Sequence, residues 1–133
     1  FGDQKYLFII HNMGKSCSYC TMWADAFNGT FEQIQKKGAF VFVTADPVDT
    51  FKELKESKGW KFRAISCHGT TFAKDTNFYF DGIGNYPGIS VFEKLEDGKI
   101  KRVSKDFFGP TDYYNNAWHV IDLLPTENIT MCS

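Results

Sequence analysis

The sequence predicts an α/β fold with a mixed central sheet flanked by helices on both faces. Three observations predict it: apolar runs of the buried-strand type alternate with stretches of helical period, a hairpin signal follows near residues 96–98, and neither repeat nor linker divides the chain. Its 133 residues suit one domain, and aromatic residues, 17% of the chain, supply a dense core. We therefore expect a single domain over residues 1–133.

The first strand and helix follow from the apolar pattern near the amino end. Residues 6–10 form a continuous apolar run, typical of a strand covered on both faces. A helix is expected from about Tyr19, and its apolar stripe consists of Trp23, Ala26, Phe27, Phe31 and Ile34. Asn28-Gly29 interrupts this stripe, which predicts a kink or two abutting helices, and Gly38 ends the helical stretch.

Two further strands, a second helix and an insertion are predicted in the middle of the chain. Residues 39–43 are β-branched and aromatic, as in a buried strand, and residues 61–65 form the next strand. Between them, Asp46 is the expected N-cap and Pro47 the first-turn residue of a helix that ends at Gly59. The polar, glycine-marked stretch 66–86 is an irregular insertion held to the body by its aromatic side chains.

The last elements are a hairpin and a closing helix. Residues 88–95 and 99–105 are strand-like, and Glu96-Asp97-Gly98 between them is a hairpin turn signal. A final helix is expected from Thr111 to Pro125, and the residues that share its apolar face are Tyr114, Ala117, Trp118 and Ile121.

Charge and hydropathy exclude several classes of partner. The formal net charge of -1 and the pI near 6.3 offer no basic surface for nucleic acid or anionic lipid. No apolar stretch approaches the roughly 20 residues of a membrane span. We expect no nucleic-acid or membrane partner, a monomer or weak dimer, and a cytoplasmic location; a start at Phe1-Gly2 is also compatible with a removed leader.

The strongest chemical signal is the motif Cys17-Ser18-Tyr19-Cys20, placed where the first loop enters the first helix. Two intervening residues let a helical turn bring the sulfurs close enough for a disulfide. The positive end of the helix dipole favours the thiolate of Cys17, and Lys15 adds to this effect. Cys17 is therefore the expected nucleophile of a redox-active centre, and Cys20 is the resolving thiol.

Two other interpretations of the cysteines stay open. Cys17 and Cys20 together with Cys67-His68 would give soft ligands for zinc or copper, although the spacing matches no common zinc pattern. Alternatively, the chain is a redox-inactive binding module. Cys67 is more simply a buried small apolar residue, and Cys132 carries no motif.

The ordered motifs resemble the thioredoxin superfamily. Its hallmarks are the Cys-x-x-Cys pair between a buried strand and an amphipathic helix, and a later proline followed by a strand, here residues 86–92. Trp23-Ala24-Asp25 and Phe27-Asn28-Gly29 are similar to an uncharacterised bacterial thioredoxin-like family. The likeness extends from Lys5 to Pro125 and includes residues 59–63 and 122–125.

This resemblance implies roles for residues outside the cysteine pair. Pro87 would follow a cis bond that lets the backbone of Tyr86 pair with an extended substrate, and Tyr19 would shape access beside Cys17. His11 occupies the place nearest to that of the buried acid that shuttles protons, and Asp25 is the other candidate.

The predicted activity is that of a thiol–disulfide oxidoreductase that needs no cofactor. Cys17 attacks a disulfide of a protein or a low-molecular-weight partner, and Cys20 then closes the intramolecular bridge and releases the thiol product. The alternative is a peroxiredoxin-like peroxidase. Residues 11–16 lack the proline and threonine that precede a peroxiredoxin nucleophile, and the only arginines that could hold a peroxide oxygen are Arg63 and Arg102.

Overall fold

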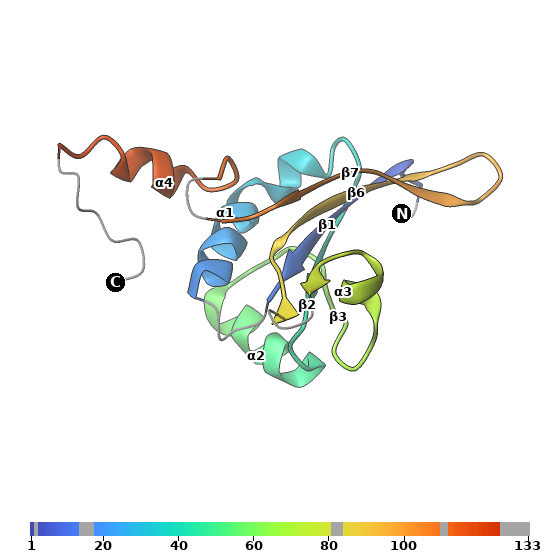
Figure 1. Cartoon of the computed structure of the whole chain (residues 1–133), viewed down its shortest axis with the longest axis horizontal. Helices are drawn as coiled ribbons and strands as arrows, with labels where there is room; N and C mark the ends of the chain where they lie inside the picture. Colours follow the sequence, from blue (N-terminus) through green and yellow to red (C-terminus); the bar gives the residue numbers. More distant parts are fainter. Residues whose placement is uncertain (2, 14–17, 81–83, 110–111, 126–133) are drawn as a thin grey trace.

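The computed structural model describes residues 1, 3–13, 18–80, 84–109 and 112–125. A five-stranded sheet in the order β3-β2-β1-β6-β7 forms its centre (Figure 1). The strands are β1 (Tyr6–Asn12), β2 (Ala39–Thr44), β3 (Ala64–Ser66), β6 (Gly88–Lys94) and β7 (Ile100–Phe107). β1 and β2 pair in parallel, as do β2 and β3, whereas β1 with β6 and β6 with β7 pair antiparallel. The predicted mixed sheet is confirmed.

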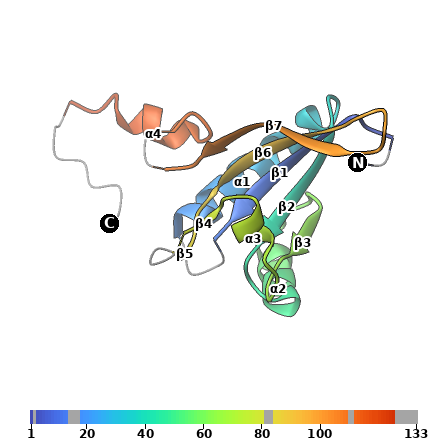
Figure 2. The same ribbon diagram turned by 45° about the vertical axis from the view of Figure 1, so that its right-hand side comes forward.

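Helices lie on both faces of this sheet, as predicted. They are α1 (Ser18–Ile34), α2 (Val48–Lys58), α3 (Phe72–Asp75) and α4 (Asn116–Ile121). Figure 2 shows α1 behind the sheet and the short α3 in front of it. α4 lies at the end of the molecule away from the β6–β7 turn in both views. None of the helices in the described ranges is long and apolar enough to cross a membrane.

The main core lies between α1, α2 and one face of the sheet. Alternate residues of a strand point to opposite faces, so Ile10 of β1 and Phe42 of β2 point toward this core. The α1 stripe supplies Trp23, Phe27 and Phe31, all of them buried. Burial of such large apolar side chains makes the largest favourable contribution to the stability of the fold.

The prediction of two abutting helices at Asn28-Gly29 is wrong, because α1 runs through both residues without interruption, and the predicted kink stays a prediction. Gly29 is exposed and has nothing packed on it, so its position needs no special backbone geometry. The Asn28 side chain accepts a hydrogen bond of 2.7 Å from the backbone N–H of Lys61. The polar pair therefore faces outward and joins the helix to the chain entering β3.

The ends of α2 follow the prediction at one terminus only. Gly59 adopts a left-handed conformation (φ 71°) and ends the helix, as expected. At the other end the N-cap position belongs to Pro47 rather than Asp46, and no side chain caps it. β3 starts at Ala64 instead of residue 61, because Phe62 turns into the core and stacks on Phe42 with ring centroids 4.7 Å apart.

α4 begins later than predicted, at Asn116 instead of Thr111. The side chain of Asn115 accepts a hydrogen bond from the N–H of Ala117 and caps the helix. Before it, the Asp112 carboxylate accepts from the N–H groups of Gly109 and Tyr114, and these bonds form a turn. Tyr114 therefore packs from a turn, whereas Trp118 is buried as the pattern indicated.

The described residues between β3 and β6 lie on the face opposite α1, in the stretch where the sequence predicted an irregular insertion. This stretch contains α3 and a small sheet of β4 (Tyr79–Phe80) and β5 (Gly84–Asn85). Phe78 is its buried anchor, whereas Tyr79 and Phe80 are exposed. The hairpin of β6 and β7 also matches the prediction, with Gly98 in the positive-φ conformation at its turn.

Candidate functional site

The start of α1 is where the sequence places the reactive cysteines. β1 ends at Asn12, and α1 begins at Ser18, the residue directly after Cys17. Cys17 lies outside the described residues, as do the side chains of Tyr19 and Cys20. The strand before the motif and the helix after it are therefore confirmed, and the distance between the two sulfurs stays a prediction.

The electrostatics at this end of α1 follow from the helix itself. α1 is 17 residues long and its first turn holds no acidic side chain. A helix of this length presents roughly half a positive charge at its start, and no carboxylate of that turn neutralises it. An anion such as a thiolate is consequently favoured there.

His11 points away from α1. It follows Ile10, whose side chain is in the main core, so the imidazole lies on the opposite face of the sheet. There its Nε2 forms a hydrogen bond of 2.9 Å with Ser90 Oγ, and its ring stacks on Phe78 with centroids 3.7 Å apart. Burial lowers the pKa of His11 to about 3, and the positive charges of Arg102 and Lys105 act in the same direction.

A neutral imidazole on the face of the sheet opposite α1 does not favour the proton-shuttle role expected for His11. Its pKa instead makes His11 a determinant of stability, because the unfolded chain binds a proton near pH 6.5 and the folded chain does so only near pH 3. The stabilising contribution is complete above about pH 6.5 and decreases as the pH falls, by up to about 1.4 kcal/mol per pH unit.

We predict that lowering the pH from 7 to 5 decreases the free energy of unfolding by about 2 kcal/mol through His11 alone. Urea unfolding of the wild type and of His11→Gln at both pH values measures this contribution. The variant should lose less stability than the wild type over the interval. Equal losses in the two proteins would contradict the assignment.

The predicted cis bond before Pro87 is wrong, since none of the peptide bonds within the described residues is cis. Pro87 is buried, and its carbonyl accepts a hydrogen bond from the N–H of Phe108, which extends the pairing of β6 with β7. The Tyr86 N–H donates to the carbonyl of Phe78 at 2.8 Å. That amide is therefore bonded inside the insertion, and a substrate role for Tyr86 stays a prediction.

The Trp23-Ala24-Asp25 motif has a packing function. Trp23 and Ala24 are buried in the main core, which confirms that Trp23 belongs to the apolar stripe of α1. The Asp25 carboxylate accepts a hydrogen bond of 2.7 Å from the indole Nε1 of Trp60, at the end of α2. Asp25 thus joins α1 to the segment entering β3, and a proton-transfer role for Asp25 stays a prediction.

We predict that Asp25→Ala lowers the free energy of unfolding by about 1–2 kcal/mol, because it leaves the buried indole N–H of Trp60 without its acceptor. Asp25→Asn keeps an acceptor oxygen in place and should lose less. Denaturant unfolding of both variants provides the measurement. A larger loss in the asparagine variant would show that the charge, rather than the hydrogen bond, matters.

Cys67 and His68 show no sign of a metal site in the described part of the chain. Cys67 is half-buried against the small cluster of Ile9, Val41 and Val43, and burial raises the pKa of its thiol. His68 Nδ1 lies 3.2 Å from the carbonyl oxygen of Ala45, to which it donates. Among the described residues, no three His, Cys, Asp or Glu side chains gather as metal ligands. The predicted zinc or copper site that includes Cys17 and Cys20 lies outside the described side chains, so it stays untested.

The two arginines considered for a peroxide lie away from the start of α1. Arg63 lines a pocket with Ala39, the first residue of β2. Ala39 lies at the opposite end of the paired strands β1 and β2 from Asn12. Arg102 pairs across from Phe92 on the face that α3 covers, and its guanidinium donates to the carbonyl of Thr76.

Three arrangements were not foreseen. Ser90 is the hydrogen-bond partner of His11 although 79 residues separate them. Phe72 and Phe78 of the insertion stack on the same ring, and Lys52 and Lys55 of α2 line a pocket beside β3. Of these three, only the stacking of Phe72 and Phe78 had a signal in the sequence, namely the aromatic residues of the stretch 66–86.

The fold is shared with solved peroxiredoxins. A cysteine-to-serine mutant of peroxiredoxin Q from Xanthomonas campestris superimposes with a TM-score of 0.70 at 13% identity, covering 90% of this chain and 78% of that protein. A reduced 2-Cys peroxiredoxin from Plasmodium vivax gives a TM-score of 0.63 at 16% identity, covering 89% and 76% of the two chains. At such identities the likeness establishes the fold alone.

A curated relative resembles the chain in sequence. Peroxiredoxin Q, chloroplastic, from Oryza sativa subsp. japonica is 24% identical over 106 residues, which make up 79% of this chain. The matched region is 49% of the relative's length, so the chain spans about half of that protein.

The chain has a thioredoxin-like fold of the kind found in peroxiredoxins, with a mixed sheet and flanking helices. The chain belongs to the bacterial protein family of unknown function DUF899, whose family model matches residues 1–128. The sequence had indicated a bacterial thioredoxin-like family, and the comparisons support a bacterial family with this fold and a distant similarity to peroxiredoxin Q.

Proposed function

We propose that the chain is a thiol-dependent peroxidase in which Cys17 reacts with a hydroperoxide and Cys20 resolves the product. The observation that carries the proposal is the likeness to peroxiredoxin Q in both sequence and fold. It favours the peroxidase alternative over the disulfide exchange that the sequence alone favoured. The long α1, which begins directly after Cys17, supports the thiolate that either reaction needs.

The reaction needs two thiols and an external reductant. The Cys17 thiolate attacks one peroxide oxygen, so that an S–O bond forms, the O–O bond breaks, and the departing alkoxide takes up a proton. Cys17 is then a sulfenic acid. The Cys20 thiol attacks its sulfur, which forms the disulfide and releases water. An external dithiol restores both thiols by exchange.

Disulfide exchange through the same pair is a second candidate, because of two specific observations. Two residues separate Cys17 from Cys20, the spacing of a dithiol couple at a helix start. Arg63 and Arg102 both lie away from the start of α1, so neither supports the binding of a peroxide oxygen there.

A direct comparison of rates tests the proposal. The reduced protein is mixed in a stopped-flow instrument with hydrogen peroxide, with cumene hydroperoxide, or with a small disulfide such as oxidised glutathione, and tryptophan fluorescence is followed. We expect the second-order rate constant for a hydroperoxide to exceed that for the disulfide. Faster reaction with the disulfide would establish the second candidate, and reaction with neither substrate would contradict both.

A further inference from the structure

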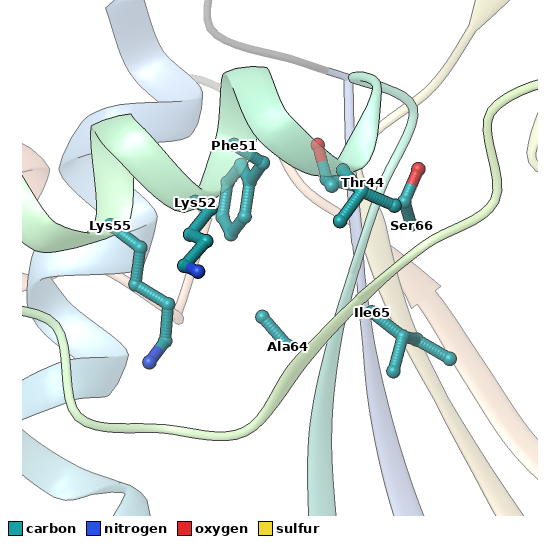
Figure 3. Close-up of a pocket in the computed structure, with 8 residues that line it drawn as sticks. Thr44, Phe51, Lys52, Lys55, Ala64, Ile65 and Ser66 are labelled. Atoms are coloured by element: carbon teal, nitrogen blue, oxygen red, sulfur yellow. The ribbon is translucent and has the colours of Figure 1, made fainter.

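A pocket of about 450 Å³ lies between α2 and the edge strand β3. Its volume falls within the range of small-molecule sites. Phe51 and Val48 of α2 form one wall, and Ala64 and Ile65 of β3 form the other. Figure 3 shows the close approach of the helix to the strand, with the ring of Phe51 between them.

Two lysines supply the charges of this pocket. Lys52 and Lys55 lie three residues apart on α2, and in Figure 3 both side chains extend from the helix toward the chain entering β3. Among the residues that the structure describes, no acidic side chain lines the pocket, and neither lysine forms an ion pair.

The hydroxyl groups at the far end of the pocket are already bonded. Thr44 Oγ1 donates to Asn12 Oδ1 and accepts from the N–H of Asp46. Ser66 Oγ donates to the Asp46 carbonyl at 2.5 Å and accepts from the N–H of His68. The lysine ammonium groups are therefore the polar partners that the pocket offers to a ligand, and the remaining walls are mostly apolar.

We propose that this pocket binds an amphipathic carboxylate, with its anionic head between Lys52 and Lys55 and its apolar body against Val48, Phe51 and Ile65. Two ammonium groups three residues apart suit one carboxylate, which accepts hydrogen bonds on both oxygens. The apolar body removes surface of the exposed Val48 and Ile65 from water. Binding here is independent of the proposed redox function.

Titration of the ¹⁵N-labelled protein with sodium decanoate tests the proposal. We expect saturable shifts of the amide signals of Ala64, Ile65 and Ser66. Acetate carries the charge without the apolar body, and decyltrimethylammonium carries the apolar body with the opposite charge. Both should bind at least about tenfold more weakly than decanoate. Equal binding of decyltrimethylammonium would overturn the proposal, because it would show that the charge plays no part.

Matched variants locate the site. Lys52→Glu/Lys55→Glu should raise the dissociation constant for decanoate by at least about tenfold. Lys58→Glu/Lys61→Glu makes the same change in net charge at exposed residues that do not line the pocket, and it should leave the affinity nearly unchanged. Val48→Asp, at a side chain 66% exposed, should weaken binding without affecting the core. Equal effects of the two double variants would contradict the assigned location.

Discussion

Cys17→Ser is expected to reduce peroxide consumption to below about 1% of the wild-type rate, because a serine hydroxyl is not ionised at neutral pH and lacks the nucleophilicity of a thiolate. Cys20→Ser should behave differently. It keeps the nucleophile, so it should consume one equivalent of peroxide and then stop with Cys17 as a sulfenic acid. Peroxide consumption, together with trapping of the sulfenic acid by dimedone and mass spectrometry, measures both outcomes.

Cys67→Ser is the matched control for these variants. Cys67 packs against the small cluster on the face opposite α1, and burial raises the pKa of its thiol, so it should not take part in the reaction. Its variant should keep the wild-type rate. If Cys67→Ser is inactive and Cys17→Ser is active, the assignment of the nucleophile is wrong.

Gly88→Ala is expected to lower the free energy of unfolding by about 3 kcal/mol. Gly88 begins β6, where a Cβ atom would overlap the ring of Phe78 and the backbone carbonyl oxygen of Asp106 in β7. Side-chain rotation cannot relieve the contact with a backbone atom, so β6 and β7 would have to separate. Denaturant unfolding followed by circular dichroism measures the loss.

Gly29→Ala, which makes the same glycine-to-alanine change, is expected to raise the free energy of unfolding rather than to lower it. Gly29 lies in the middle of α1, is exposed, and has no atom in contact with the position of a Cβ. Alanine there should raise the free energy of unfolding by roughly 0.5–1 kcal/mol, because it lowers the conformational entropy of the unfolded chain. A loss of stability in Gly29→Ala, or none in Gly88→Ala, would contradict the packing at these two glycines.

The parts of the fold that the sequence predicted well depend on local patterns. The continuous apolar runs identified β1 and β2, and Glu96-Asp97-Gly98 identified the β6–β7 hairpin. Errors arose where a contact distant in sequence or a side-chain cap decided the structure. α1 continues through Asn28, whose side chain bonds to the chain before β3, and α4 begins after Asn115, whose side chain provides the cap, rather than at Thr111.

The candidate site was predictable to the same extent. Cys17 and Cys20 are close in the chain, so their spacing carried the hypothesis without a fold. The environment of His11 could not be inferred, because Ser90 and Phe78 come from β6 and the insertion. Residues 6–10 are all apolar, so the local pattern does not show which of them face α1. The structure shows that Ile10 packs in the main core, which places the imidazole of His11 on the opposite face.

The most direct test of the central claim is to map the disulfides after the reduced protein has reacted with one equivalent of hydrogen peroxide. The protein is alkylated, digested and analysed by mass spectrometry. We expect a disulfide between Cys17 and Cys20, with Cys67 recovered as an alkylated thiol. Recovery of Cys17 and Cys20 as unoxidised thiols, or a disulfide that joins Cys67 to either of them, would contradict the assigned chemistry.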